Sequence, residues 1–306
     1  MYKIGIDIGS TTAKAVLTDN NNTIVYSNYL RHNADVQKTL LEILKQIQEK
    51  IGADIEIEII VTGSAGMGIA ERVGVFFIQE VMAASNFVSN YTSNIKSMID
   101  IGGEDSKIIF FEDNSSLPVM RMNGNCAGGT GAFIDQMALI LGVSVDELDQ
   151  LAQKSKHIYP IASRCGVFSK TDVQNLVAKG VSKEDIAASI FNAIALQVVS
   201  SLSKGMRIEA KILFCGGPLT YIKSLREAFA RVLELNAEDF VILPNSNLIP
   251  AMGCVFTTGE RGSRIRIDEL ISKLSNTNNN IPSSKSKRLE PIFKSEEELS
   301  KWRKDK

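Results

Sequence analysis

The stretch Ile6-Asp7-Ile8-Gly9-Ser10-Thr11-Thr12-Ala13-Lys14 occurs a second time along this chain in related form. It aligns without a gap to Ile99-Asp100-Ile101-Gly102-Gly103-Glu104-Asp105-Ser106-Lys107. Both copies follow the pattern I-D-I-G-x-x-x-x-K, in which a strand enters a glycine turn and a second strand follows. A weaker echo pairs Val61-Thr62-Gly63 with Phe214-Cys215-Gly216. Internal repetition of this kind predicts a duplicated lobe.

Outward from each copy, the apolar pattern predicts an α/β chain of two similar lobes. We expect three strands in each half, over 3–8, 13–17 and 24–29, and over 97–101, 107–111 and 119–122. Helices are predicted between and after them, including one over 35–50 and a long one over 183–204. The two glycine turns would then face a common cleft, each with one carboxylate.

The expected lobe boundaries follow from this repeat. Lobe I comprises residues 1–95 together with about 245–270, and lobe II comprises residues 96–244. Residues 271–306 are rich in Ser, Asn and Lys at first, which predicts a polar linker. The short segment after it is expected to be the stub of a possible following module.

Composition excludes several classes of function. The 306 residues carry a formal net charge of -1, which argues against nucleic acid or an anionic membrane as a partner. No run approaches the length of a membrane span, and Asp7 interrupts the start where a signal peptide needs apolar residues. We therefore expect a cytoplasmic protein. Histidine-based metal sites are nearly ruled out, because His32 and His157 are the only histidines.

The two hairpins have the composition of a phosphate-binding site. A glycine turn lets backbone N–H groups approach a polyphosphate, and hydroxyls and a lysine add donors and charge. Asp7 and Asp100 could together hold a hydrated Mg²⁺ opposite a triphosphate. Glu104 could orient the water that attacks the γ-phosphate. The candidate phosphate-binding residues are Gly9, Ser10, Thr11, Thr12, Lys14, Gly102 and Gly103.

A nucleoside platform is predicted downstream, where a strand runs into a Gly-Gly turn before a helix. Its candidate residues are Gly216, Gly217, Pro218 and Thr220. No G-x-x-x-x-G-K-[ST] run occurs, so a P-loop site is excluded.

The four cysteines divide into two pairs by context. Cys126 and Cys165 each lie just before a predicted helix, where the dipole favours thiolate and an anionic centre. Such positions suit a cubane iron–sulfur cluster, but a [4Fe–4S] cluster needs four cysteines. A two-fold homodimer would supply two from each subunit. Small buried hydrophobic residues remain the alternative for this pair. Cys215 and Cys254 lack this context and are expected to be structural.

Several of these motifs resemble those of a known superfamily of proteins. Ile4 to Lys14, Asp100 to Lys107 and Cys215-Gly216-Gly217 resemble the two phosphate motifs and the adenosine motif of the acetate and sugar kinase, heat-shock chaperone and actin superfamily. Ile249 to Cys254 resembles its second connecting helix. This resemblance implies a two-lobed actin-like ATPase with duplicated ribonuclease-H-like lobes and a nucleotide cleft between them.

Two further motifs narrow the resemblance. Asn125 to Gly131 and Ser163 to Phe168 resemble the cysteine motifs of the activators (component A) of 2-hydroxyacyl-CoA dehydratases and the ATPase subunits of benzoyl-CoA reductases. The family implies one [4Fe–4S] cluster that bridges a homodimer, with Cys126 and Cys165 as ligands. It also implies that ATP, bound by Ser10, Thr11, Thr12, Ala13 and Lys14 and by the Gly216-Gly217 turn, is hydrolysed to ADP. Hydrolysis drives a low-potential electron from ferredoxin or flavodoxin to a partner dehydratase or reductase.

Departures and rival functions accompany this resemblance. Glu104 stands where dehydratase activators often carry glutamine. The sequence from Gly124 to Gly129 resembles that of long multidomain members of the family more closely. A small-molecule kinase of the same superfamily, without a cluster, is the alternative function. A nucleotide-dependent binding or filament protein with no redox role is a third.

Overall fold

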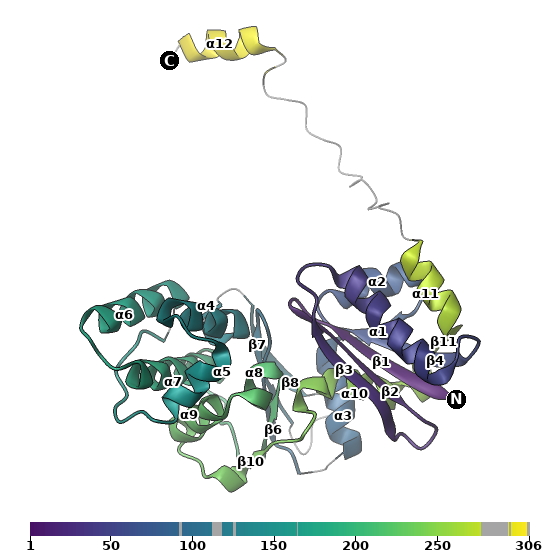
Figure 1. Cartoon of the computed structure of the whole chain (residues 1–306), viewed down its shortest axis with the longest axis horizontal. Coiled ribbons are helices and arrows are strands. Elements are labelled where there is room, and N and C mark those ends of the chain that lie inside the picture. Colours follow the sequence, from purple (N-terminus) through teal and green to yellow (C-terminus); the bar gives the residue numbers. More distant parts are fainter. Residues whose placement is uncertain are drawn as a thin grey trace.

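The computed structural model describes residues 1–91, 94–111, 118–124, 127–163, 165–276, 293 and 295–304, apart from the side chains of 258–260. Two mixed sheets, each accompanied by helices, form two lobes that lie side by side (Figure 1). The α/β class and the two-lobed arrangement agree with the expectation from the sequence.

The first sheet is built around β1 (Tyr2–Ile8), whose Ile4, Ile6 and Ile8 are buried. This strand pairs antiparallel with β2 and parallel with β4, so it lies at the centre of the sheet. Central strands are covered on both faces, which explains the nearly continuous apolar run. The order is β11 (Ser263–Arg266), β4 (Glu56–Thr62), β1, β2 (Thr12–Thr18) and β3 (Ile24–Arg31), with β5 (Phe76–Phe77) paired to β4.

The second sheet repeats the plan of the first. Its central strand β6 pairs antiparallel with β7 and parallel with β9, as β1 pairs with β2 and β4. The order is β10 (Phe240–Val241), β9 (Ile212–Cys215), β6 (Ser97–Ile101), β7 (Ser106–Phe110) and β8 (Val119–Asn123). The duplication predicted from the I-D-I-G pattern is therefore present in the topology.

Helices cover the sheets. The first lobe carries α1 (Val36–Ile51), α2 (Gly66–Val73) and α11 (Ile267–Ser275). The second carries α4 (Gly131–Leu141), α5 (Val145–Ala152), α6 (Gly166–Ala178), α7 (Lys183–Leu202), α8 (Gly217–Tyr221) and α9 (Lys223–Leu233). Short 3-10 turns occur at Ala127–Gly129, Ala237–Asp239 and Ser246–Leu248. Helix α12 (Glu296–Lys304) buries no residue.

Two helices, α3 (Glu80–Tyr91) and α10 (Ile249–Arg261), connect the lobes near the middle of the molecule (Figure 1). One hydrophobic cluster joins Val16 of the first sheet, Leu213 of the second, Phe87 of α3 and Ile249 of α10. The backbones approach closely here, because a Cβ on Gly253 of α10 would overlap a carbonyl oxygen of α3. The helix pair thus forms a shared core between the two sheets.

Helix α7 is apolar over a longer stretch than the sequence analysis allowed. Within the part of the chain that the structure describes, it is the one helix whose length and composition would suit a membrane span. Of its most apolar 18 residues, 72% are buried inside the fold, where they pack with α5, α6 and α9. A core helix passes the same test of length and composition.

The predicted lobe boundary at residue 271 falls inside α11. Leu270 and Leu274 of this helix are buried in the core of the first lobe, against α1 and α2. The spacing of these two leucines is helical, but it lies beside a polar run that masks it in the sequence. The division into lobes I and II otherwise stays a prediction.

Candidate functional site

The strand register aligns the two predicted hairpins residue by residue. Asp7 lies opposite Lys14 in the first hairpin, and Asp100 lies opposite Lys107 in the second. The same carboxylates lie beside the last residue of β4 and the last residue of β9. The structure therefore gives both copies of the I-D-I-G-x-x-x-x-K pattern the same place in their sheets.

The glycines of the weaker echo also correspond in structure. Gly63 follows β4 with φ +93°, and Gly216 follows β9 with φ +85°. A Cβ on Gly63 would overlap the Ile8 carbonyl oxygen, and one on Gly216 would overlap that of Ile101. Both turns need glycine, since an L side chain is strained at positive φ and finds no room.

A cleft runs between the two hairpins and collects residues from both lobes. It brings together most of the predicted phosphate-binding and nucleoside residues. Its lining includes Gly9, Ser10, Thr11, Thr12, Lys14, Asp100, Gly102, Gly103, Gly216, Gly217 and Pro218. Tyr29, Arg31, Ser64, Glu80, Asp105, Gly131, Ala132 and Asp135 complete the lining and were not predicted. The predicted residues Asp7, Ala13, Glu104 and Thr220 do not line it.

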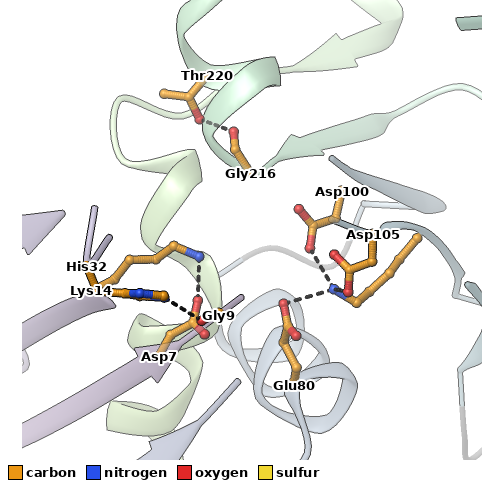
Figure 2. A network of polar contacts seen from close by, with 10 residues as sticks. Asp7, Gly9, Lys14, His32, Glu80, Asp100, Asp105, Gly216 and Thr220 are labelled. Carbon is orange, nitrogen blue, oxygen red and sulfur yellow. Dashed lines mark hydrogen bonds and ion pairs between the residues drawn. The ribbon is translucent and has the colours of Figure 1, made fainter. Parts of the chain in front are cut away.

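Two lysines neutralise the acidic groups at the cleft, the buried Lys107 and the partly buried Lys14, of which Figure 2 labels Lys14. Lys14 Nζ lies 2.6 Å from Asp7 Oδ2. Lys107 Nζ lies 2.9 Å from Asp105, 3.1 Å from Glu80 and 3.7 Å from Asp100. Buried charges are tolerated only when paired in this way.

The ionisation of these groups follows from burial and pairing. Burial alone would lower the pKa of Lys107, but Asp100, Glu80 and Asp105 raise it well above its usual value. Lys14 likewise has a raised pKa, because Asp7, Glu80 and Asp100 outweigh its burial. Burial raises the pKa of Asp100, against the attraction of Lys107. Both lysines are therefore charged at neutral pH.

Glu80 is a candidate functional residue that the sequence analysis missed. It begins α3 and faces the cleft near Asp100 and Asp105 (Figure 2). Burial raises its pKa from 4.5 to about 7, with Lys107 opposing the shift. In the sequence, Glu80 could have been found as a lone carboxylate in the first turn of a helix, between the apolar Ile78 and Val81.

Glu104 lies elsewhere than the predicted role requires. The side chain is exposed at the turn of the second hairpin, whereas its neighbour Asp105 lines the cleft. Its role as the group that orients water stays a prediction.

The nucleoside turn joins the cleft to a second groove. Thr220 Oγ1 donates a hydrogen bond of 2.8 Å to the Gly216 carbonyl oxygen and closes the turn (Figure 2). Tyr29 reaches across from β3 so that its hydroxyl lies against Gly217, and its ring meets that of Tyr221 edge-on at 6.1 Å. These tyrosines and Pro218 line the groove, which offers a planar ring an apolar wall.

An ion pair between the lobes lies at the rim of both the cleft and the groove. Arg31 of β3 donates to Asp135 of α4 at 3.0 and 3.3 Å. Both side chains are partly exposed, so the pair contributes roughly 0–1 kcal/mol to stability.

The described cysteine of the predicted pair lies where the sequence analysis expected it. Cys165 is the N-cap of α6, is half-buried, and its thiol makes no capping hydrogen bond. Cys126 lies outside the described residues. The loops of the two motifs nevertheless touch, because Gly166 lies against the backbone of Gly128.

The remaining cysteines are buried in the core. Cys215 ends β9 and Cys254 lies in α10, and burial raises the pKa of both thiols well above the usual value. They are therefore protonated, which is consistent with the structural role expected for them.

The second hairpin is bonded directly to the helix that follows the Cys126 motif. The Gly131 N–H donates to the Gly102 carbonyl oxygen at 2.9 Å, and the Ala132 N–H donates to that of Gly103 at 2.8 Å. These two bonds attach the loop of the hairpin to the first turn of α4.

Among the described residues, no group of three or more His, Cys, Asp or Glu is placed to hold a metal ion. A site for hydrated Mg²⁺ needs only one or two carboxylates, since this ion keeps several waters. Asp7 Oδ1 is buried without a hydrogen-bond partner, which leaves an acceptor for such a water.

Comparison with known proteins decides the family. The sequence profile of the BadF/BadG/BcrA/BcrD ATPase family matches residues 4–257. The chain belongs to this family. It is 32% identical over 248 residues to the 2-hydroxyisocaproyl-CoA dehydratase activator of Clostridioides difficile, covering 80% of this chain and 90% of the relative.

Two further relatives agree. The (R)-2-hydroxyglutaryl-CoA dehydratase activating ATPase of Acidaminococcus fermentans is 30% identical over 217 residues, covering 71% of this chain and 83% of the relative. The solved activator of 2-hydroxyisocaproyl-CoA dehydratase from Clostridium difficile, with bound ADPNP, superposes with a TM-score of 0.71 at 26% identity. It covers 91% of this chain and 99% of that structure.

These comparisons confirm the family and the actin-like ATPase fold expected from the motifs. Membership of the BadF/BadG/BcrA/BcrD ATPase family and the ADPNP-bound relative support ATP binding and hydrolysis. The relatives named above are activators of 2-hydroxyacyl-CoA dehydratases.

Proposed function

We propose that this member of the BadF/BadG/BcrA/BcrD ATPase family is an iron–sulfur activator. It hydrolyses ATP and delivers a low-potential electron to a 2-hydroxyacyl-CoA dehydratase or a related reductase. The observation that carries the proposal is the bonding of the second phosphate hairpin to α4, the helix that follows the Cys126 motif. This contact would connect the proposed nucleotide cleft to the proposed cysteine site.

In this proposal the cleft binds ATP or ADP across both lobes. The loops of the two hairpins take the phosphates, with Lys14 as a cation at the edge. The Gly216-Gly217 turn and Pro218 take the nucleoside. The groove beside Tyr29 and Tyr221 suits the base, because a base stacks on aromatic rings. Asp7 and Asp100 would hold Mg²⁺ through its waters.

Hydrolysis needs a group that orients the attacking water. Glu104 is the residue proposed from the sequence, although its side chain is exposed. Glu80 is better placed, since it lines the cleft and its pKa of about 7 suits proton transfer near neutral pH. Replacing each by glutamine distinguishes them, and we expect Glu80→Gln to lower the hydrolysis rate more than Glu104→Gln.

Cys126 and Cys165 would hold one [4Fe–4S] cluster together with the same residues of a second copy. The half-buried Cys165 at the start of α6 fits a cluster ligand, because the helix N–H groups there favour an anion. One chain cannot complete the ligand set, so the proposal requires a homodimer. The cluster, when bound, would itself be the one-electron donor to the acceptor enzyme.

The surface beside Cys165 suits contact with another protein. Val167 and Phe168 follow it on α6 and are 70% and 66% exposed. Exposed apolar side chains next to the cysteine loop favour a second copy there and the acceptor enzyme nearby. Ferredoxin or flavodoxin is the proposed donor, and the cytoplasm the proposed location.

The test is the rate of phosphate release from ATP under anaerobic conditions, without any added sugar or acid. We expect steady hydrolysis that falls at least tenfold in Asp100→Asn, which removes a charge at the proposed Mg²⁺ site. Asp54→Asn is the matched control, because Asp54 is 85% exposed and precedes β4, at the end opposite the cleft. Strict dependence on an added small molecule would instead support the kinase.

A further inference from the structure

His32 is a buried histidine that the proposed mechanism does not use. It follows β3 and is 6% exposed. Its Nε2 lies 3.1 Å from the carbonyl oxygen of Gly9, in the first phosphate loop (Figure 2). Its Nδ1 accepts the backbone N–H of Ala34 at 3.2 Å. Because Nδ1 accepts a hydrogen bond, the ring carries a proton on Nε2, and His32 donates it to the Gly9 carbonyl oxygen.

This bond fixes the direction of one peptide unit of the loop. In a planar trans peptide, the C=O of one residue and the N–H of the next point in opposite directions. Holding the Gly9 carbonyl toward His32 therefore turns the Ser10 N–H away from it. Ser10 lines the cleft, where an N–H donor can meet a phosphate oxygen.

In the second hairpin, a different donor binds the carbonyl oxygen that is equivalent to that of Gly9. Each loop is closed by an equivalent bond, from Gly9 N–H to the Thr12 oxygen and from Gly102 N–H to the Asp105 oxygen, both 2.9 Å. The Gly102 carbonyl then accepts the Gly131 N–H at the start of α4. The repeat thus places a donor on the equivalent carbonyl in both lobes: a helix N–H in the second and the His32 side chain in the first.

We propose that His32 is a positioning residue for the ATP site. By holding the Gly9 carbonyl, it keeps the Ser10 N–H directed at the phosphates. The inference rests on the proposed nucleotide site and adds a residue to it. His32 itself does not touch the nucleotide.

Three substitutions of His32 test the two hydrogen bonds of its imidazole separately. In His32→Gln the side-chain amide reaches the place of Nε2, so the bond to Gly9 can be kept. In His32→Asn the amide reaches only the place of Nδ1, so the Ala34 contact is kept and the Gly9 bond is lost. His32→Phe fills the space and makes neither bond.

The measurement is the dissociation constant of Mg-ATP by calorimetry, with adenosine as the ligand that lacks phosphates. We expect roughly tenfold weaker ATP binding in His32→Asn and His32→Phe, as for one lost hydrogen bond of about 1.4 kcal/mol. Adenosine binding should stay within about twofold, and His32→Gln should stay within about threefold of the wild type for ATP. Thermal melting of each variant reports whether it is folded.

Two results would overturn the inference. One is ATP binding by His32→Asn at the wild-type level. The other is a loss in His32→Gln as large as in His32→Phe, which would mean that the bond to Gly9 does not matter. Wild-type protein that binds no ATP would refute the proposed nucleotide site itself, and so the two failures are distinguishable.

Discussion

At the scale of single residues, the positive charges of two lysines offset the negative charges of the carboxylates around the cleft. The ammonium of Lys107 contacts three carboxylates, and that of Lys14 contacts Asp7. Removing charges from water costs several kcal/mol each unless they are paired, so the acids and lysines stabilise one another. For Glu80, as for Asp100, burial outweighs the pairing with Lys107, and it raises the pKa of Glu80 to about 7.

Glu80 should make stability depend on pH. Its pKa is about 7 in the folded chain, above the ordinary 4.5, so the folded state holds the proton more tightly. Its contribution is therefore fully present below pH 4.5 and is lost as pH rises toward 7. We expect Glu80→Gln to lose less stability than the wild type between pH 5 and pH 8, measured by urea unfolding.

The control for that experiment is Glu71→Gln, at an exposed carboxylate of α2. It should reproduce the pH dependence of the wild type. Equal slopes for Glu80→Gln and the wild type would contradict the assignment.

The residues predicted from the sequence are those whose pattern is local. Asp100 and the glycines of the hairpins lie within one repeated strand and turn, so the repeat was sufficient to find them. Tyr29 and Asp135 reach the cleft from the end of an edge strand and from a helix of the other lobe. Only the packing of distant segments brings such side chains together, and no spacing along the chain encodes it.

At the scale of elements, the turn after the fourth strand of each repeat, β4 or β9, depends on glycine. Gly63→Ala and Gly216→Ala should each destabilise the chain by about 2–4 kcal/mol, because the new Cβ meets a carbonyl oxygen at positive φ. Urea unfolding measures this loss. Gly68→Ala in α2, with nothing within 4 Å of its Cβ position, should instead be neutral or stabilise by up to about 1 kcal/mol. Unchanged stability in Gly216→Ala would contradict the account.

Long periodic elements were predicted, whereas two short elements of the first lobe were missed. Helix α1 was expected because apolar residues recur at helical spacing from Val36 to Ile51, over about four turns. Helix α2 and strand β11 span only 8 and 4 residues, and too few apolar positions fall within them to establish a period.

The link between the second hairpin and α4 predicts a nucleotide effect on Cys165. In protein without a cluster, Mg-ATP should change the alkylation rate of the Cys165 thiol by about threefold or more, because a shift of α4 moves the adjoining loops. The buried Cys215 and Cys254 serve as internal controls. Asp100→Asn should abolish the effect, and an unchanged Cys165 rate in the wild type would contradict the link.

At the scale of the whole molecule, two copies of one sheet plan enclose a nucleotide cleft, with α3 and α10 packed between them (Figure 1). The resemblance and the family comparison agree on this architecture. Cys165 and the described part of the Cys126 motif belong to the second lobe, just before α6 and α4 respectively. An activator of this design would use nucleotide occupancy in the cleft to control a redox centre built from both copies of a dimer.

The most direct measurement of this claim is the EPR spectrum and iron content of protein prepared without oxygen, reconstituted with iron and sulfide and then reduced. The account predicts a cubane signal and about two iron atoms per chain. The signal should be lost in Cys126→Ala and Cys165→Ala and kept in Cys254→Ala, whose cysteine is buried in α10. A colourless wild-type protein without iron, or an undiminished signal in Cys126→Ala, would contradict it.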